Sequence, residues 1–210
     1  MTYRLYGRRQ TGSMAIEAAL NLIGAEWQLE EVASDPSEAE RAAFQRINPR
    51  GQVPVLVHPD GTVISEGPAI LVHLADAFPA AGLVPVPGST ARARHDRWLA
   101  FFHANVYEGM LREFYADRYT DDPAGVSAVQ SAATSYVRRH FQIFEAEVAA
   151  RIGKGFCCGD RVAALDIYIW MLCFWLEDGW LAANCPEMHA LWLRTRALPA
   201  LLPVEQAHFG

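Results

Sequence analysis

The sequence predicts an α/β domain followed by an all-α helical domain, and three observations lead to this prediction. Within residues 1–77, short strand-like and helix-like segments follow one another in the order β-α-β-α-β-β-α. Residues 78–88 (FPAAGLVPVPG) are rich in proline and glycine, which is typical of a linker. From residue 89 to residue 210 the pattern is helical throughout. The chain has 210 residues, 51% hydrophobic and 20% charged, so it can bury a sizeable core and is neither a disordered chain nor a disulfide-stapled mini-protein.

The first domain begins with a short strand, because apolar and polar residues alternate over residues 2–7. Residues 13–23 place apolar side chains on one helical face, and Gly24 supplies the stop signal of that helix. Residues 27–33 form a second predicted strand. A second helix over residues 37–47 is expected because Ser37 and Glu40 form a capping-box pattern.

A hairpin and a third helix complete this domain. Two apolar runs, 53–58 and 62–65, flank the Pro59-Asp60-Gly61 turn, which is a hairpin signal. Pro68 then suits the first turn of a helix that starts near Glu66.

In the second domain four helices are expected. They cover residues 89–117, 123–152, 164–177 and 186–196. The third of them is strongly apolar but carries Asp166, whose carboxylate suits the N–H groups at a helix entry. It is shorter than a membrane span, so it is expected to be a buried core helix.

Charge and cysteine content limit the classes of partner. Lys and Arg number 18 and Asp and Glu 24, which gives a net charge of -6 and argues against nucleic acid as a partner. The four cysteines, Cys157, Cys158, Cys173 and Cys185, lack the spacing of zinc ligands, so no metal is expected. The cysteines are expected to be reduced thiols, as in cytosolic proteins. The first residues lack the apolar region of a signal peptide, and no segment is long enough to span a membrane. We therefore expect a cytoplasmic protein that binds no membrane.

At this point the order of elements and the motifs together resemble the cytosolic glutathione transferase family, over essentially the whole chain. The most specific match is the run Gly51-Gln52-Val53-Pro54-Val55-Leu56, followed twelve residues after Pro54 by Glu66. Residues 12–17 (GSMAIE) resemble the bacterial members that use a serine or cysteine at the first helix. The resemblance implies a thioredoxin-like first domain, a helical second domain and glutathione as co-substrate.

The resemblance also implies a glutathione site. Val53, before a cis Pro54, is expected to pair its backbone with the cysteinyl part of glutathione, and Gln52 adjoins it. Glu66 and Gly67 are expected to hold the γ-glutamyl end, because a helix N-terminus favours a carboxylate. Gly67 replaces the serine usual in the family, so a hydroxyl hydrogen bond is missing.

Arg9 and Gln10 border the loop before the first helix, where an arginine could meet a glutathione carboxylate or be a solvated surface cation.

Thiol activation needs a hydroxyl donor, because hydrogen bonding stabilises the thiolate. Three candidates are open, and Ser13 comes first because the Gly12-Ser13 pair resembles the serine-type bacterial members of the family. Ser13 stands at the start of the first helix, Thr11 lies two residues earlier, and Tyr6 ends the first strand. Each also has a structural interpretation: Ser13 or Thr11 as a helix cap, and Tyr6 as a packing residue.

The first helix of the second domain is expected to line an electrophile pocket, as it does in the family. Aromatic rings suit apolar substrates, and phenols or a guanidinium suit a leaving group. The candidate residues are Asn105, Tyr107, Phe114, Tyr115 and Arg118. Half of these rings could equally be plain core.

The sequence therefore predicts a homodimeric glutathione transferase that conjugates glutathione to a small apolar or aromatic electrophile, with a detoxification role. Two alternatives stay open. One is a glutathione-dependent ether or thioether lyase, or a dehalogenase, on the same fold. The other is a non-catalytic ligand-binding or interaction module, which Gly67 slightly favours.

Overall fold

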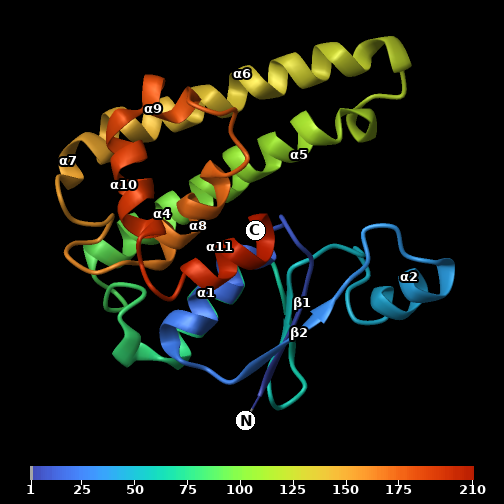
Figure 1. The fold of residues 1–210 in the computed structure, drawn as a ribbon, viewed down its shortest axis with the longest axis horizontal. Helices are drawn as coiled ribbons and strands as arrows, with labels where there is room; N and C mark the ends of the chain where they lie inside the picture. The colour runs from blue at the N-terminus through green and yellow to red at the C-terminus, as the bar shows by residue number, and fades with distance from the viewer. Residues whose placement is uncertain (1) are drawn as a thin grey trace. The chain divides into compact units, whose positions relative to one another are not determined.

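The computed structural model describes residues 2–210 and divides into two compact units (Figure 1). The first unit comprises Met1–Val84 together with Arg196–Gly210, and the second comprises Pro85–Thr195. The chain therefore leaves the first unit within the expected linker. The end of the chain differs from the expected domain organisation, because residues 196–210 pack with the first unit instead of the helical one.

The first unit contains a mixed four-stranded sheet with the strand order β2-β1-β3-β4. Its strands are β1 (Tyr3–Gly7), β2 (Trp27–Glu31), β3 (Val55–Val57) and β4 (Val63–Ser65). β1 and β2 are parallel, while β3 is antiparallel to both of its neighbours. The predicted hairpin is confirmed: the His58 N–H donates to the Thr62 carbonyl at 2.8 Å, and Gly61 takes the left-handed conformation that the turn requires.

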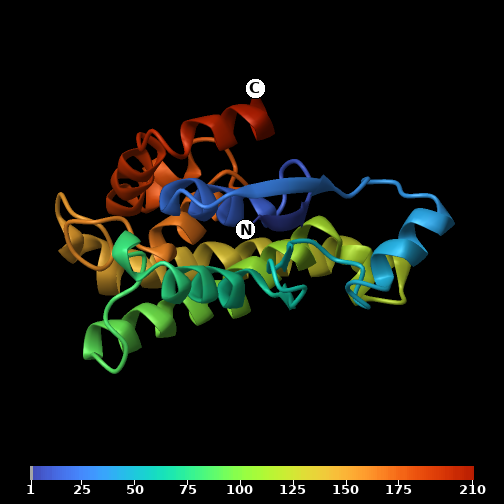
Figure 2. The same ribbon diagram turned by 90° about the horizontal axis from the view of Figure 1, so that it is seen from below.

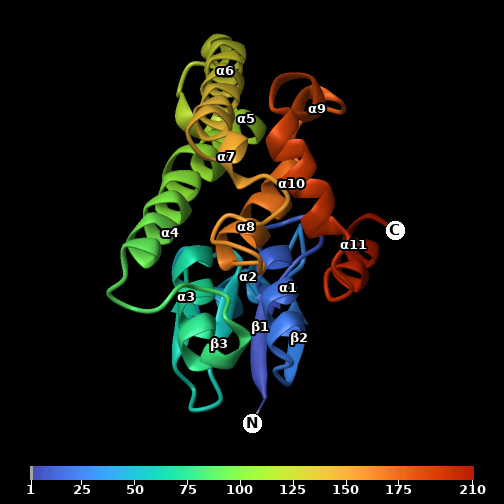
Figure 3. The same ribbon diagram turned by 90° about the vertical axis from the view of Figure 1, so that its left-hand side faces the viewer.

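Three helices follow the predicted order around this sheet: α1 (Ser13–Ile23), α2 (Glu38–Gln45) and α3 (Gly67–Ala77). α1 and α3 pack together (Figure 3). Their local signals act as expected. Gly24 ends α1 with φ of 66°, and the Ser37 hydroxyl and Glu40 carboxylate exchange hydrogen bonds with each other's backbone N–H.

One helix of the first unit escaped the sequence analysis. α11 (Leu202–Phe209) packs on α1 and buries Leu201, Val204 and His208 (Figure 1). These three residues recur every three or four positions, and Pro203 stands in the first turn of the helix. The sequence therefore carried a helical pattern here, but over a short segment. A bidentate ion pair between Arg196 and Glu205 fastens the segment that leads into this helix.

The helices of the second unit, coloured from green to orange in Figure 2, are more interrupted than predicted. They are α4 (Thr90–Phe101), α5 (Glu108–Phe114), α6 (Val126–Phe144), α7 (Ala150–Ile152), α8 (Ala164–Cys173), α9 (Trp180–Asn184) and α10 (Pro186–Arg196). π-helical turns at Phe102–Tyr107 and Glu145–Ala149 interrupt the two long helices. No helix within residues 2–210 combines the length and the apolarity needed to cross a bilayer.

The first π-helical turn has a visible local cause. The Asn105 side chain donates from Nδ2 to the Phe101 carbonyl at 3.0 Å. In an α-helix that carbonyl would accept the backbone N–H of Asn105. A side chain that takes over a carbonyl in this way shifts the backbone ladder and interrupts the regular helix.

Aromatic side chains form the core of the second unit. Trp98 lies 5.0 Å from Phe144 between ring centroids, and Phe102 lies 4.9 Å from Phe144 and 5.8 Å from Phe141. These T-shaped pairs are the edge-to-face arrangement that aromatic quadrupoles favour.

The fully buried helix α8 is capped by two polar residues. Asp166 accepts the Ala163 N–H at 2.8 Å and the Cys157 N–H at 2.9 Å. His95 accepts the Leu165 N–H on Nε2 at 3.2 Å, and its Nδ1 lies 2.8 Å from Asp96. Burial lowers the pKa of His95, so the ring stays neutral and keeps this acceptor nitrogen. Asp166 therefore binds N–H groups at the helix entry, as the sequence predicted, but it forms only half of a capping box because Ala163 has no side-chain oxygen.

Asp166 makes the stability of the second unit depend on pH. Burial raises the pKa of its carboxyl to about 6, so the folded protein keeps a proton that the unfolded chain has already lost. The free energy of unfolding should therefore fall as pH rises from about 4 to about 7, by up to about 3 kcal/mol from this group. Denaturant unfolding of the wild type and Asp166→Asn across this range measures the effect. The stability difference between them should shrink or reverse as pH rises, and a pH-independent difference contradicts the expectation.

Candidate functional site

The strand register brings three segments of the first unit to one end of the sheet. Tyr6 of β1 pairs with Val55 of β3, and Val55 pairs with Ser65 of β4. The residues just beyond these positions are therefore neighbours in space. They are the loop of residues 8–12, here called the α1 loop, the Val53–Pro54 pair, and Glu66 with Gly67.

Val53 offers an open stretch of backbone at this end of the sheet. The Val53–Pro54 bond is cis, as the family resemblance implied. Val53 lies just before β3, and within residues 2–210 its backbone N–H and C=O make no hydrogen bond. An extended ligand can therefore pair with this backbone as an added strand would.

A residue that the sequence analysis missed, Asn48, shapes the loop that carries Val53. Asn48 is buried, donates from Nδ2 to the Gln52 carbonyl at 2.7 Å, and accepts the Arg50 N–H at 3.2 Å. The Gln52 side chain stays exposed. The Asn48-Pro49 dipeptide is a turn signal that could have pointed to this role.

Glu66 stands immediately before α3 in an uncommon conformation. Its φ is 66°, the left-handed region, which a non-glycine residue adopts at a cost of about 1–2 kcal/mol. Its carboxylate pairs with the Arg50 guanidinium at 2.8 Å, and both side chains are about half exposed. Arg50 was not anticipated. Gly67 is buried and is the first residue of α3. The N-cap residue, Glu66, makes no capping hydrogen bond with its side chain.

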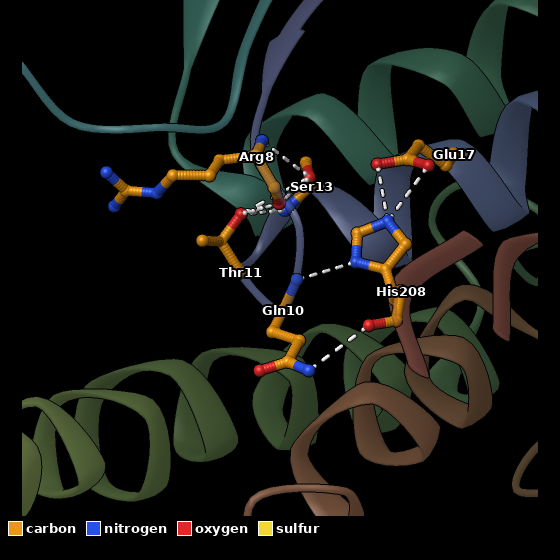
Figure 4. A network of polar contacts seen from close by, with 6 residues as sticks. All are labelled: Arg8, Gln10, Thr11, Ser13, Glu17 and His208. Atoms are coloured by element: carbon orange, nitrogen blue, oxygen red, sulfur yellow. Dashed lines mark hydrogen bonds and ion pairs between the residues drawn. The ribbon is translucent and has the colours of Figure 1, made fainter. Parts of the chain in front are cut away.

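The hydroxyls of Thr11 and Ser13 share one acceptor (Figure 4). Thr11 Oγ1 donates to the Arg8 carbonyl at 2.7 Å, Ser13 Oγ donates to the same carbonyl at 3.1 Å, and the two oxygens are 3.3 Å apart. Ser13 is fully buried, whereas Thr11 is partly exposed. Of the two residues, Thr11 is therefore the more exposed to solvent.

Gly7 explains the burial of Ser13. A Cβ at position 7 would lie 2.6 Å from the Cβ and 2.8 Å from the Oγ of Ser13, which is closer than real Cβ contacts. Only glycine at this position allows the end of β1 and the start of α1 to approach so closely.

Tyr6 points away from the two hydroxyls. Successive side chains of a strand point to opposite faces, and the Gly7 position faces Ser13. The Tyr6 ring contacts Phe44 of α2, with centroids 5.7 Å apart. The structure therefore does not bring Tyr6 together with Thr11 and Ser13, and its packing interpretation describes it better.

Arg9 and Gln10 both bond to α11 and its end. Arg9 donates to the Gly210 backbone oxygen at 3.3 Å, and Gln10 donates from its backbone N to His208 Nδ1 at 2.8 Å. His208 also contacts Glu17, and neither residue was singled out from the sequence. Gln10 is the second non-glycine residue in the left-handed region, with φ of 56°.

In the second unit, Asn105 and Tyr107 lie on the first π-helical turn. Asn105 Oδ1 accepts the Tyr136 hydroxyl at 2.6 Å. The Tyr107 ring stacks on Tyr168 at 6.2 Å and meets Trp175 at 5.7 Å. His103 joins this aromatic cluster, with Nδ1 2.8 Å from the Tyr168 hydroxyl. π-helical turns frequently accompany functional sites, a signal that only the structure supplies.

The other expected pocket residues form a separate, exposed group. Phe114 and Tyr115 end α5, and the Arg118 guanidinium lies 4.0 Å above the Tyr115 ring. Seven residues separate Phe114 from Tyr107, or about 10 Å at the rise of an α-helix. The structure therefore does not gather all five expected residues around one point.

Three comparisons bear on the family. Residues 13–77 match the family model described as "Glutathione S-transferase, N-terminal domain". The curated protein "Glutathione S-transferase GstA" of Escherichia coli O157:H7 is 28% identical over 129 residues, which span 61% of this chain and 59% of that protein. A solved sphingomonad glutathione S-transferase complexed with glutathione is 27% identical, with a TM-score of 0.80 over 98% of both chains.

Residues 13–77 are thus similar to the N-terminal domain of glutathione S-transferases, and 98% of the chain is similar to a solved member of that family. A glutathione transferase homologue from Sulfitobacter with bound glutathione, 22% identical, shares the fold with a TM-score of 0.87 over 98% of each chain. The expected thioredoxin-like and helical architecture of a glutathione transferase is thereby confirmed. The serine or cysteine type of first helix stays a prediction.

The four cysteines, Cys157, Cys158, Cys173 and Cys185, are free thiols. Burial and the nearby Asp166 carboxylate raise the pKa of the Cys157 thiol, which makes a reactive thiolate unfavourable there. No group of three or more His, Cys, Asp or Glu side chains within residues 2–210 is arranged to hold a metal ion.

The contact between Gly7 and Ser13 predicts a steric coupling. Gly7→Ala should destabilise the protein by about 1–3 kcal/mol, because the new methyl group overlaps Ser13. Ser13→Gly removes the overlapped atoms, so Gly7→Ala should cost less in a Ser13→Gly background. A double-mutant cycle of unfolding free energies measures this coupling. Strict additivity of the two changes contradicts the close approach.

Proposed function

We propose that this chain is a glutathione S-transferase that joins the thiolate of glutathione to a small apolar or aromatic electrophile. The observation that carries the proposal is the convergence at one end of the sheet. An open backbone at Val53, a helix N-terminus at Gly67 and two hydroxyls at the start of α1 become neighbours there through the pairing of Tyr6, Val55 and Ser65. Glutathione needs all three kinds of partner.

Each part of glutathione then has a partner of matching chemistry. The Val53 N–H and C=O pair with the cysteinyl backbone, beside Pro54 and Gln52. The γ-glutamyl carboxylate lies at the first turn of α3, where free N–H groups and the helix dipole favour an anion. The Glu66 carboxylate pairs with the ligand amine, exchanging its present partner Arg50. Exposed ion pairs contribute at most about 1 kcal/mol, so this exchange is easy.

The hydroxyl of Thr11 donates to the glutathione sulfur and stabilises its thiolate. Thr11 is partly exposed and Ser13 is fully buried, which supports Thr11 as the donor to the glutathione sulfur in place of Ser13. Ser13 competes for the Arg8 carbonyl, so it can satisfy that acceptor when Thr11 turns to the thiol. A hydrogen bond to a charged group contributes about 1.5–3 kcal/mol, enough to lower a thiol pKa by about one to two units.

The transfer step itself is nucleophilic. The thiolate attacks an electrophilic carbon, a carbon–sulfur bond forms, and the leaving group departs with the bonding electrons. Holding the two reactants together supplies much of the remaining acceleration. The aromatic cluster of His103, Tyr107, Tyr168 and Trp175 supports an apolar or aromatic second substrate. No metal or separate redox cofactor is part of this proposal.

The proposal includes a homodimer, following the resemblance stated for the sequence. Light scattering coupled to size exclusion at micromolar concentrations should give twice the 23.3 kDa mass of one chain. A monomer across that range rejects this part alone.

Thiol activation can be measured directly. Ultraviolet absorbance of the thiolate, followed while glutathione-saturated protein is titrated with base, should give an ionisation midpoint well below that of free glutathione. Thr11→Val should raise the midpoint by about one unit, because it removes one charge-assisted hydrogen bond. Ser13→Ala is the matched control and should raise it less.

Other outcomes of this titration distinguish the alternatives. If glutathione binds with an unshifted thiol, a binding module replaces the transferase. If the thiol ionises but no conjugate forms with aryl halides, while an ether, thioether or halide substrate is cleaved, lyase or dehalogenase chemistry replaces conjugation.

Glu66 provides a separate test of the binding site. Glu66→Gln should raise the glutathione Kd by about tenfold or more, because the amine of glutathione loses its carboxylate partner. Arg50→Gln is the matched control: it breaks the same ion pair but leaves the Glu66 carboxylate available, so glutathione should bind no more weakly. Isothermal titration calorimetry measures both. Equal weakening by the two variants contradicts the role given to Glu66.

A further inference from the structure

His208 of α11 makes contact with the α1 loop 198 residues earlier in the chain (Figure 4). It is 2% exposed, although histidine is a polar residue. Its Nδ1 lies 2.8 Å from the backbone N of Gln10, and its Nε2 lies 3.1 Å from each carboxylate oxygen of Glu17. Both ring nitrogens are therefore satisfied by α1 and the loop that precedes it.

These contacts fix the tautomer of His208. A backbone N–H can only donate, so Nδ1 must carry a lone pair to accept from Gln10. The proton of the neutral ring then sits on Nε2 and donates to the Glu17 carboxylate. Glu17 is 4% exposed, so it holds the ring in one orientation as buried carboxylates commonly do for histidines.

Gln10 is the point of the loop that needs such support. Its φ of 56° is unfavourable for a residue with a Cβ and persists only where the surroundings impose it. Here one residue holds Gln10 twice, since the Gln10 side chain also donates to the His208 backbone carbonyl at 3.2 Å.

The left-handed turn at Gln10 lies between Arg8 on one side and Thr11 and Ser13 on the other. Arg8 offers the carbonyl before the turn, and Thr11 and Ser13 bring their hydroxyls back to that carbonyl after it. A change at Gln10 therefore changes where both hydroxyls stand. His208 touches neither hydroxyl and acts on them only through the backbone of the loop.

We propose that His208, oriented by Glu17, is a positioning residue that holds the α1 loop in the conformation from which Thr11 stabilises the glutathione thiolate. His208 has this role only if the chain activates glutathione as proposed above. The C-terminal helix is in this way part of the thiol-activating apparatus, because it supports the loop that carries Thr11.

Two substitutions separate the functions of the two ring nitrogens. His208→Asn places a side-chain oxygen near the position of Nδ1 and keeps an acceptor for Gln10. His208→Gln places an amide nitrogen near the position of Nε2, keeps the donor to Glu17 and leaves the Gln10 N–H unpaired. Both remove the same ring, so loss of packing affects both.

In His208→Gln, the thiol ionisation midpoint of bound glutathione should rise by about one unit and kcat should fall about tenfold. The KM for glutathione should change less, because Val53, Glu66 and Gly67 are untouched. His208→Asn should restore most of kcat. Equal losses in both variants, or none in His208→Gln, overturn the positioning role while leaving the proposed function intact.

The wild-type protein gives a second measurement, in case the variants fold poorly. Nitrogen-15 NMR of the histidine ring should find His208 with a bare Nδ1 and a protonated Nε2. The opposite tautomer overturns the inference. If the wild-type protein does not ionise bound glutathione, the proposed function is wrong and the role of His208 is wrong with it. The titration of the wild type alone gives that result, without any variant.

Discussion

The antiparallel register of β3 between β1 and β4 is the constraint on which the candidate site depends. It places Tyr6, Val55 and Ser65 in one row and so makes neighbours of the α1 loop, Val53 and Glu66. Val55, Leu56 and Val57 are buried on both faces of the sheet, so their burial alone does not select a register. The turn that joins β3 to β4 fixes their pairing, because turn type and loop length set the register of a hairpin. The register in turn sets the positions of the candidate ligand-binding groups.

In each of the two units a buried histidine joins a backbone N–H group to a carboxylate. His208 accepts the Gln10 N–H and faces Glu17, and His95 accepts the Leu165 N–H and faces Asp96. A neutral imidazole has one donor and one acceptor, so it can join a backbone N–H to a carboxylate with neither left unpaired. In the second unit the result is a capped core helix. In the first unit the result is a supported α1 loop. The same hydrogen-bonding arrangement therefore stabilises a core helix in one unit and a loop of the candidate site in the other.

Backbone strain in this chain is confined to the site. Within residues 2–210, the non-glycine residues with positive φ are Gln10 and Glu66, and both flank the end of the sheet where glutathione is proposed to bind. Gln10 is held by a buried partner outside its own segment, His208, while the carboxylate of Glu66 makes an exposed ion pair with Arg50. Strained residues persist where surrounding structure over-determines them, and they are concentrated at sites that need groups held in a fixed direction.

The sequence by itself determined the four strands and the first three helices of the first unit, the hairpin turn and the Ser37 capping box. These follow from local signals: periodicity, turn residues and caps act within a few positions. The segments of the candidate site followed from the family resemblance. Only the tertiary structure decided that Ser13 is buried against Gly7, that Tyr6 points away, that Arg50 pairs with Glu66, and that α11 returns to hold Gln10. It also separated Phe114 and Tyr115 from Tyr107. The physical reason is that these contacts join residues far apart in the chain, so they depend on how the elements pack, and no local pattern records that packing.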